Sequence, residues 1–166
     1  MLYKAFYQSP LGKILLLGNK ENLIGLWFEK QKFFGANFSL KRIIKKNTPE
    51  LQKTKIWLDK YFSGKKVDTK NINLNPQTTP FRKKVFSILE KIPYGHQTTY
   101  KEIAKKLSPK KGKNKLYPRA IGGAVAHNPI SIFIPCHRVI STKGDLTGYA
   151  GGIKRKKKLM ELENIS

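Results

Sequence analysis

The sequence of 166 residues contains a single cysteine, Cys136, and only three histidines. One cysteine cannot form an internal disulfide, so the reducing cytoplasm is the expected location. A cysteine and three histidines at wide spacing do not make a structural zinc site. No apolar stretch approaches the length of a transmembrane helix, and the N-terminus lacks the apolar core of a secretory signal. The chain is long enough for one or two small domains, each with a buried core.

Acidic residues are also scarce, with 10 against 34 lysines and arginines, which gives a formal net charge of +24. A coding bias toward lysine explains lysine in place of arginine, but it does not explain the missing acids. Such an excess attracts the phosphates of DNA or RNA without sequence preference. A membrane surface is a weaker alternative, because no basic stretch carries a clean apolar face. The charge therefore indicates a polyanionic partner.

The N-terminal part of the chain shows the pattern of a small sheet followed by a helix. Apolar residues predict strands over residues 2–8, 13–17 and 23–28, and the short turns between them favour antiparallel pairing. Residues 49–62 carry apolar side chains at mostly helical spacing. Thr48 is the predicted N-cap of this helix.

A linker and three helices are predicted after this sheet. Residues 63–79 are poor in apolar groups, which predicts two domains, at 1–77 and 78–166. Helices are expected over residues 80–90, 100–107 and 118–127, and the last two are compatible with a helix-turn-helix. Gly122 and Gly123 within the third helix favour close approach of another surface to the backbone, either DNA or a neighbouring helix.

The most informative stretch is residues 132–140, where Cys136, His137 and Arg138 follow one another between apolar flanks. A lone cysteine is most simply a small buried side chain. Its cationic neighbours would nevertheless stabilise a thiolate, which is the nucleophilic form. Pro135 predicts a turn there, because proline has no N–H to continue a ladder. These features favour a reactive cysteine presented by a turn.

His137 is the candidate base for this cysteine. Adjacent side chains on a strand point to opposite faces, so a direct hydrogen bond between Cys136 and His137 is not expected in extended backbone. A bridging water, or a bent local backbone, would be needed. A catalytic histidine also needs an acid to orient it. Glu161 and Glu163 are the candidates, although their spacing alone favours simple balance of surface charge.

Residues 134–140 resemble the active-site signature of the O6-alkylguanine-DNA alkyltransferases, also called methylated-DNA–protein-cysteine methyltransferases. Further stretches resemble the same family in the same order: residues 92–95, 98–100, 119–124, 128–129 and 148–152. The similarity is strong over about residues 78–163, and it extends weakly to residues 9–12 and 25–28.

The resemblance implies an α+β fold with a ribonuclease H-like N-terminal domain and a helical C-terminal domain containing a winged helix-turn-helix. It implies repair of O6-alkylguanine, and of O4-alkylthymine, in double-stranded DNA, by a monomer that binds the minor groove. The damaged base is flipped out of the duplex, because the stack hides its alkylated oxygen. The alkyl group passes to Cys136 once per molecule, and no cofactor is required.

The family pattern also assigns roles. Cys136 attacks the alkyl carbon, His137 takes the thiol proton through a water, and Glu163 orients His137. The residues expected to contact DNA or substrate, or to support such contacts, are Tyr100, Arg119, Gly122, Asn128, Arg138, Val139, Tyr149 and Ala150.

Within this binding group, Arg119 fills the place of the flipped base and Asn128 fixes the hinge after the recognition helix. Tyr100 pushes the phosphate, helps to hold the base and, with the Ala150 amide, stabilises the departing guanine. The Val139 carbonyl reads the amino group of that guanine. Tyr149 belongs to the loop that closes over the base, and Gly122 to the helix face that approaches the minor groove. Arg138 is better suited to holding loops together than to touching substrate.

Two features depart from the family pattern. Residues 108–116 lengthen the turn before the recognition helix and add basic charge, which indicates either a tolerated insertion or an extra phosphate contact. Ser131 and Thr147 stand where many members have a proline and a glycine. The β-branched Thr147 adds bulk and stiffness, so we expect methyl to be removed readily and benzyl poorly.

Two other classes stay open at this point. One is a catalytically silent module that binds damaged DNA, but such proteins lack the cysteine at this position. The other is a cysteine hydrolase, which would need a fixed contact between Cys136 and His137 and would not need the large positive charge.

Overall fold

The computed structural model folds as two compact units. It describes residues 1–107, 117–146 and 148–165. The first unit comprises Met1–Gln77 and Pro129–Phe133, and the second comprises Thr78–Asn128 and Ile134–Ser166. The chain therefore returns to the first unit immediately before the segment that contains Cys136.

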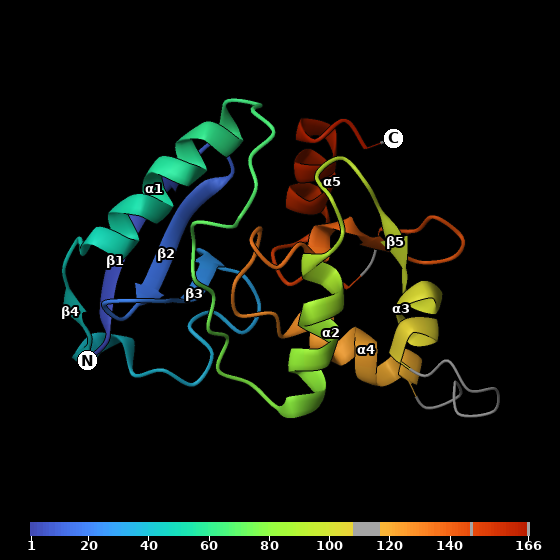
Figure 1. The fold of residues 1–166 in the computed structure, drawn as a ribbon, viewed down its shortest axis with the longest axis horizontal. Coiled ribbons are helices and arrows are strands. Elements are labelled where there is room, and N and C mark those ends of the chain that lie inside the picture. The colour runs from blue at the N-terminus through green and yellow to red at the C-terminus, as the bar shows by residue number, and fades with distance from the viewer. Residues whose placement is uncertain (108–116, 147, 166) are drawn as a thin grey trace. The chain divides into compact units, whose positions relative to one another are not determined.

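The first unit contains a four-stranded sheet with the strand order β3-β2-β1-β4 (Figure 1). Its strands are β1 (Tyr3–Ser9), β2 (Gly12–Gly18), β3 (Leu23–Phe28) and β4 (Ile44–Lys45), and a 3-10 turn, η1 (Leu40–Arg42), precedes β4. The first three strands are antiparallel, as the apolar pattern predicts. β4 pairs in parallel with β1, so the sheet is mixed rather than purely antiparallel. A strand of two residues is too short to show alternation, which is why the sequence did not predict it.

Helix α1 (Pro49–Phe62) packs against β1, β2 and β3 and has the predicted bounds. The Thr48 hydroxyl oxygen accepts a hydrogen bond from the Leu51 N–H at 3.3 Å. This contact satisfies one of the N–H groups that have no partner inside the helix. Gly64 follows the helix with φ +89°, an angle that glycine adopts without steric cost. Local signals in the sequence therefore set both ends of this helix.

The second unit is mainly helical. Its elements are α2 (Pro80–Glu90), β5 (Thr98–Thr99), α3 (Tyr100–Leu107), α4 (Tyr117–Ala126), the 3-10 turn η2 (Cys136–Arg138), β6 (Val139–Ile140) and α5 (Ile153–Leu162). Helices α2, α3 and α4 pack against one another, α5 packs against η2, and β5 pairs in parallel with β6. Helices α2 and α3 have the predicted bounds. Thr99 caps α3, because its hydroxyl oxygen accepts a hydrogen bond from the Glu102 N–H at 3.1 Å.

Helix α5 was not predicted from the sequence. Residues 154–158 are all basic, and only Leu159 and Met160 follow as apolar residues of the buried face. Lys156 completes that face and is fully buried. Because a charged residue occupies a core position, the apolar residues alone do not show helical spacing, and the sequence does not predict the helix.

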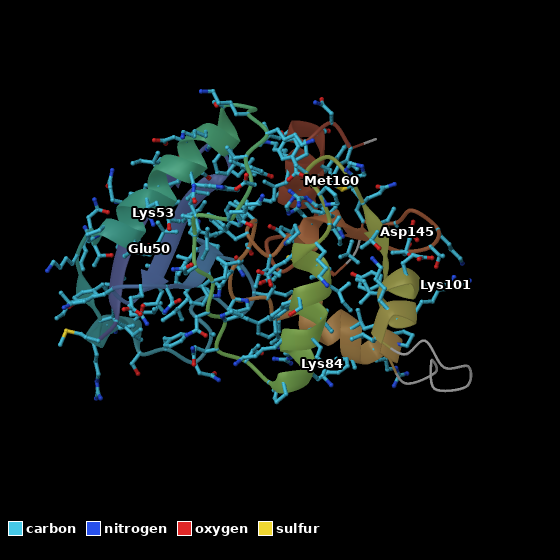
Figure 2. The ribbon with its side chains drawn as sticks, in the orientation of Figure 1. Glu50, Lys53, Lys84, Lys101, Asp145 and Met160 are labelled. Atoms are coloured by element: carbon cyan, nitrogen blue, oxygen red, sulfur yellow. The ribbon has the colours of Figure 1, made fainter. Side chains whose placement is uncertain are left out.

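The surface of both units is basic. Exposed lysines include Lys53 on α1, Lys84 on α2 and Lys101 on α3 (Figure 2). Within the ranges that the structure describes, no helix is long and apolar enough to cross a membrane.

Candidate active site

Two local features place Cys136 at the start of a turn. The Cys136 N–H donates to the Ile134 carbonyl at 2.8 Å, across Pro135, which has φ −80° and ψ 65°. Cys136 then begins the 3-10 turn η2, so the predicted turn at the proline is present. Cys136 and His137 both lie in η2, so the backbone between them is bent rather than extended.

Asn128 holds the sulfur of Cys136 in place. Its Nδ2 atom donates to Sγ at 3.0 Å and to the Ile134 carbonyl at 2.7 Å. Both side chains are buried, with exposed fractions of 1% for Cys136 and 2% for Asn128. An amide NH₂ has two protons, which accounts for both bonds. Asn128, the predicted hinge after the recognition helix, is thus in direct contact with the candidate nucleophile Cys136.

Burial raises the pKa of the Cys136 thiol to about 11. Three influences work in the opposite direction: the hydrogen bond from Asn128, the positive charge of Lys156, and the backbone N–H groups of Cys136 and His137. The resting sulfur is therefore a neutral thiol. Groups that favour the thiolate nevertheless already surround it, and they act once a base removes the proton.

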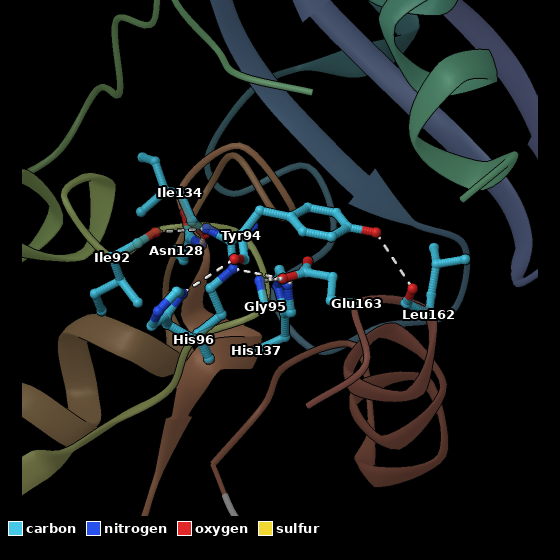
Figure 3. A network of polar contacts seen from close by, with 10 residues as sticks. Ile92, Tyr94, Gly95, His96, Asn128, Ile134, His137, Leu162 and Glu163 are labelled. Carbon is cyan, nitrogen blue, oxygen red and sulfur yellow. Dashed lines mark hydrogen bonds and ion pairs between the residues drawn. The ribbon is translucent and has the colours of Figure 1, made fainter. Parts of the chain in front are cut away.

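His137 and Glu163 form a buried pair, although 26 positions separate them in the chain. The Nε2 atom of His137 lies 2.5 Å from Oε2 of Glu163. The other carboxylate oxygen, Oε1, accepts from Arg138 Nε at 2.7 Å. It also accepts from the Gly95 N–H at 3.2 Å (Figure 3). Glu161, the other acid considered, is exposed. Tertiary structure therefore selects Glu163 as the acid beside His137.

Burial controls the charge of this pair. It lowers the pKa of His137 against the influence of Glu163. Burial also acts to raise the pKa of Glu163, but the hydrogen bonds from His137 and Arg138 outweigh it and hold that pKa well below its usual range. Because Arg138 already balances the carboxylate, we infer that His137 is neutral and carries its proton on Nε2, which it donates to Glu163.

The second nitrogen of His137 is the one that can act as a base. Nδ1 is buried and has no hydrogen-bond partner among the described residues. Among the described residues, no hydrogen bond joins the imidazole of His137 to the thiol of Cys136. A proton that leaves Cys136 for Nδ1 must therefore pass through an intervening molecule, and a water can fill that role.

Arg138 joins loops of the second unit. Besides Glu163, its guanidinium donates from Nη1 to the Ile92 carbonyl at 2.7 Å and lies 6.0 Å from the centre of the Tyr94 ring. The residue is 9% exposed. The Tyr94 hydroxyl in turn donates to the Leu162 carbonyl at 3.3 Å (Figure 3). These contacts support the interpretation of Arg138 as a link between loops.

Sequence reasoning missed Lys156. Its ammonium donates to the Val139 carbonyl at 2.5 Å, and its side chain is fully buried. Burial lowers the pKa of Lys156 to about 8, although the negative charge of an ionised Cys136 would raise it. The available signal was helical spacing, since Lys156 precedes Leu159 and Met160 by three and four positions. The Val139 carbonyl, expected to read the base, therefore already accepts a hydrogen bond from Lys156.

Tyr100 lies beside the loop that was expected to close over the base. Its hydroxyl oxygen would be 2.7 Å from a Cβ placed on Gly148, which has φ +77°. Burial raises the pKa of Tyr100, and the nearby charge of an ionised Cys136 adds to the effect. Tyr149 and Ala150 are buried in the same loop, with exposed fractions of 6% and 9%.

Arg119 and Gly122 lie apart from these contacts. Arg119 is exposed near the start of α4. A Cβ placed on Gly122 would meet no atom within 4 Å, so the backbone is open there. Ser131 is buried, whereas the predictions about Thr147 and residues 108–116 lie outside the described residues. No group of three or more potential metal ligands occurs in the part of the chain that the structure describes.

Comparisons with known proteins agree over the whole chain. Residues 2–76 match the family description "6-O-methylguanine DNA methyltransferase, ribonuclease-like domain", and residues 80–165 match "6-O-methylguanine DNA methyltransferase, DNA binding domain". A methylated-DNA–protein-cysteine methyltransferase of Methanosarcina barkeri is 41% identical over 162 residues, which are 98% of this chain and 97% of that protein. The corresponding protein of Haemophilus influenzae is 37% identical over 164 residues, 99% of this chain and 87% of that protein.

A solved structure shows the same fold. Mycobacterium tuberculosis OGT in complex with DNA superposes with a TM-score of 0.84 at 34% identity, covering 97% of this chain and 92% of that one. The predicted α+β fold class is thereby confirmed. Both family descriptions match, so the chain belongs to the methylated-DNA–protein-cysteine methyltransferase family, also known as the O6-alkylguanine-DNA alkyltransferases.

Proposed function

We propose that this protein repairs DNA directly, by moving an alkyl group from the O6 atom of guanine to the sulfur of Cys136. The members of its family are methyltransferases that act on methylated DNA and whose acceptor is a protein cysteine. The present chain has one cysteine, so Cys136 is the single residue available as acceptor. This observation carries the proposal, and the contact between Asn128 and the sulfur supports it.

Activation of the nucleophile uses the neutral His137. The thiol proton passes through a water to Nδ1, and the imidazolium that forms is stabilised by the carboxylate of Glu163. The thiolate gains the hydrogen bond from Asn128 and the positive charge of Lys156. Burial opposes a permanent thiolate, so we expect the charge to form only when the substrate is in place.

Transfer is a direct displacement at the alkyl carbon. The bond from Sγ of Cys136 to that carbon forms while the bond from carbon to O6 of guanine breaks. The guanine leaves with the electron pair and ends by taking the proton that the thiol released. We assign the stabilisation of this leaving group to the Tyr100 hydroxyl and the Ala150 amide, and recognition of its amino group to the Val139 carbonyl.

Access to the base requires the duplex to open. The Mycobacterium tuberculosis relative has been solved in complex with DNA, which supports binding of DNA by this chain. We propose that α4 enters the minor groove, where the open backbone at Gly122 allows close approach. Arg119, exposed near the start of the helix, then takes the place of the flipped base. Tyr149 belongs to the loop that covers the flipped base.

The product is a thioether, which water does not cleave under mild conditions. Each molecule therefore acts once. We further propose that it acts as a monomer and needs no cofactor. O4-alkylthymine is the second expected substrate, because its alkylated oxygen presents the same chemistry to the thiolate.

Mass spectrometry after mixing the protein with duplex DNA containing O6-methylguanine tests the proposal. A stable added mass of one methyl group on the peptide containing Cys136 is the expected result. A protein that binds the DNA without gaining mass would be a silent damage-binding module. Absence of both binding and adduct would favour the hydrolase alternative. Cys136→Ala should bind the DNA without acquiring an adduct, because the phosphate contacts lie elsewhere.

A further inference from the structure

The segment leading to Cys136 contains an unusual turn at Ile132. The Phe133 N–H donates to the Ser131 carbonyl at 2.9 Å, and the single residue between them, Ile132, has φ +72°. This is a γ-turn whose central residue is in the left-handed region, a rare and strained arrangement. A positive φ is most costly for a β-branched residue, because Cβ crowds the following carbonyl.

A second γ-turn follows at once. The Cys136 N–H donates to the Ile134 carbonyl at 2.8 Å, and Pro135 between them has φ −80° and ψ 65°. This turn has the opposite hand and little strain, and proline favours its φ. The chain therefore turns twice between Ser131 and Cys136. The direction in which it leaves the first turn affects where the sulfur lies.

Contacts within the first unit hold the strained turn on both sides. Before it, the Leu26 N–H donates to the Pro129 carbonyl at 2.8 Å, and the Ser131 N–H donates to the Leu26 carbonyl at 3.2 Å. After it, the Phe133 ring lies 4.2 Å from the ring of Trp57, centre to centre.

Burial strengthens this hold. The Ile132 side chain is 2% exposed. The Trp57 ring is itself fixed, because its Nε1 donates to the Asp68 carbonyl at 2.6 Å. Strained backbone persists only where the surroundings determine it more than once, and this segment meets that condition.

We propose that Ile132 is a positioning residue for alkyl transfer. A residue with a Cβ restricts the backbone at position 132, and the buried surroundings hold it in the left-handed turn. The held turn sets the path by which the chain reaches Pro135 and places the sulfur of Cys136. The inference rests on the proposed role of Cys136 as the acceptor. A glycine at position 132 would adopt the same φ freely, but it would also allow other angles, so the turn would lose strain and rigidity together.

The test compares Ile132→Gly with Ile132→Ala, which both remove the side chain beyond Cβ. Only glycine removes the energetic penalty of a positive φ. The folding equilibrium constant of Ile132→Gly, measured by urea unfolding, should therefore exceed that of Ile132→Ala by about fivefold. The first-order rate of methyl transfer at saturating DNA should change in the opposite direction. We expect the glycine variant to be about tenfold slower than the alanine variant, because small misplacements of a nucleophile are costly.

Ile130 supplies the matched control. It is fully buried in the same segment and does not have a positive φ. There Ile130→Gly should be less stable than Ile130→Ala, since glycine gains nothing from the backbone angle. The affinity for DNA should be the same in all four variants, because a positioning role changes transfer and leaves phosphate contacts intact.

Each outcome decides the proposal. If Ile132→Gly is no more stable than Ile132→Ala, the backbone at position 132 is not strained. If Ile132→Gly transfers the methyl group as fast as Ile132→Ala, Ile132 does not position Cys136. If the truncated variants do not fold, Phe133→Leu replaces them, and unchanged transfer after loss of the Trp57 contact would overturn the proposal. Absence of any methyl on wild-type Cys136 would instead refute the proposed function, while the stability comparison would still report the strain.

Discussion

Replacing Lys156 with methionine should stabilise the protein at neutral pH and slow methyl transfer at the same time. Burial lowers the pKa of this lysine from 10.5 to about 8. While the lysine is charged in both states, a difference of this size costs the folded state roughly 3 kcal/mol. Methionine removes that cost, but it leaves the Val139 carbonyl short of one hydrogen bond, a loss of about 1 to 2 kcal/mol. The expected net gain in unfolding free energy is about 1 to 2 kcal/mol.

The gain should depend on pH in a defined direction. Below pH 8 the lysine is protonated in both the folded and the unfolded chain, and the full cost is present. As pH rises from about 8 to 10.5, the folded protein releases the proton while the unfolded chain keeps it, so the wild type becomes relatively more stable. The raised pKa of Cys136 acts in the opposite direction at high pH, but it is present in both proteins and largely cancels.

Transfer should slow because the charge of Lys156 favours the thiolate of Cys136. Each unit by which the thiol pKa rises reduces the thiolate fraction about tenfold at neutral pH. Urea unfolding at pH 7 and pH 9.5, with methyl transfer measured at pH 7, tests both parts. A methionine variant that is less stable at pH 7, or whose advantage does not shrink at pH 9.5, would refute the reasoning.

Four further predictions follow from the site. Glu163→Gln should reduce stability by about 3 kcal/mol in urea unfolding, because it leaves the buried charge of Arg138 unpaired, and single-turnover measurements should show slower transfer. Arg119→Ala should slow repair of duplex DNA far more than reaction with free O6-methylguanine. If the two rates fall equally, Arg119 has no role in base flipping. The affinity for DNA should fall steeply with salt in a binding titration, and a flat response would place the excess charge away from the DNA. Free O6-benzylguanine should inactivate the wild type poorly and Ser131→Pro/Thr147→Gly more readily, and potent inactivation of the wild type would contradict this.

Local signals in the sequence predicted most of the regular structure. The caps at Thr48 and Thr99 work through contacts within a few residues, so helices α1 and α3 have their predicted bounds. Strand β4 and helix α5 were not predicted. β4 has only two residues, and the buried Lys156 interrupts the apolar period of α5.

The sequence by itself determined the family, the polyanionic partner and the single available acceptor, because Cys136 has no alternative and its neighbours form a specific motif. The family resemblance implied Glu163 as the acid beside His137, but only the tertiary structure gives the physical reason. Spacing treats Glu161 and Glu163 alike, whereas packing of α5 on η2 buries one and leaves the other in solvent.

The same limit applies to Lys156 and to the strained turn at Ile132. Helical spacing from Leu159 and Met160 allows Lys156 to face the core, but spacing alone does not show that a charged side chain is buried there. Nothing in an apolar segment reveals a positive φ at a β-branched residue. Burial and backbone angle at such positions depend on contacts between residues that are distant in the chain, and these contacts exist only in the folded protein.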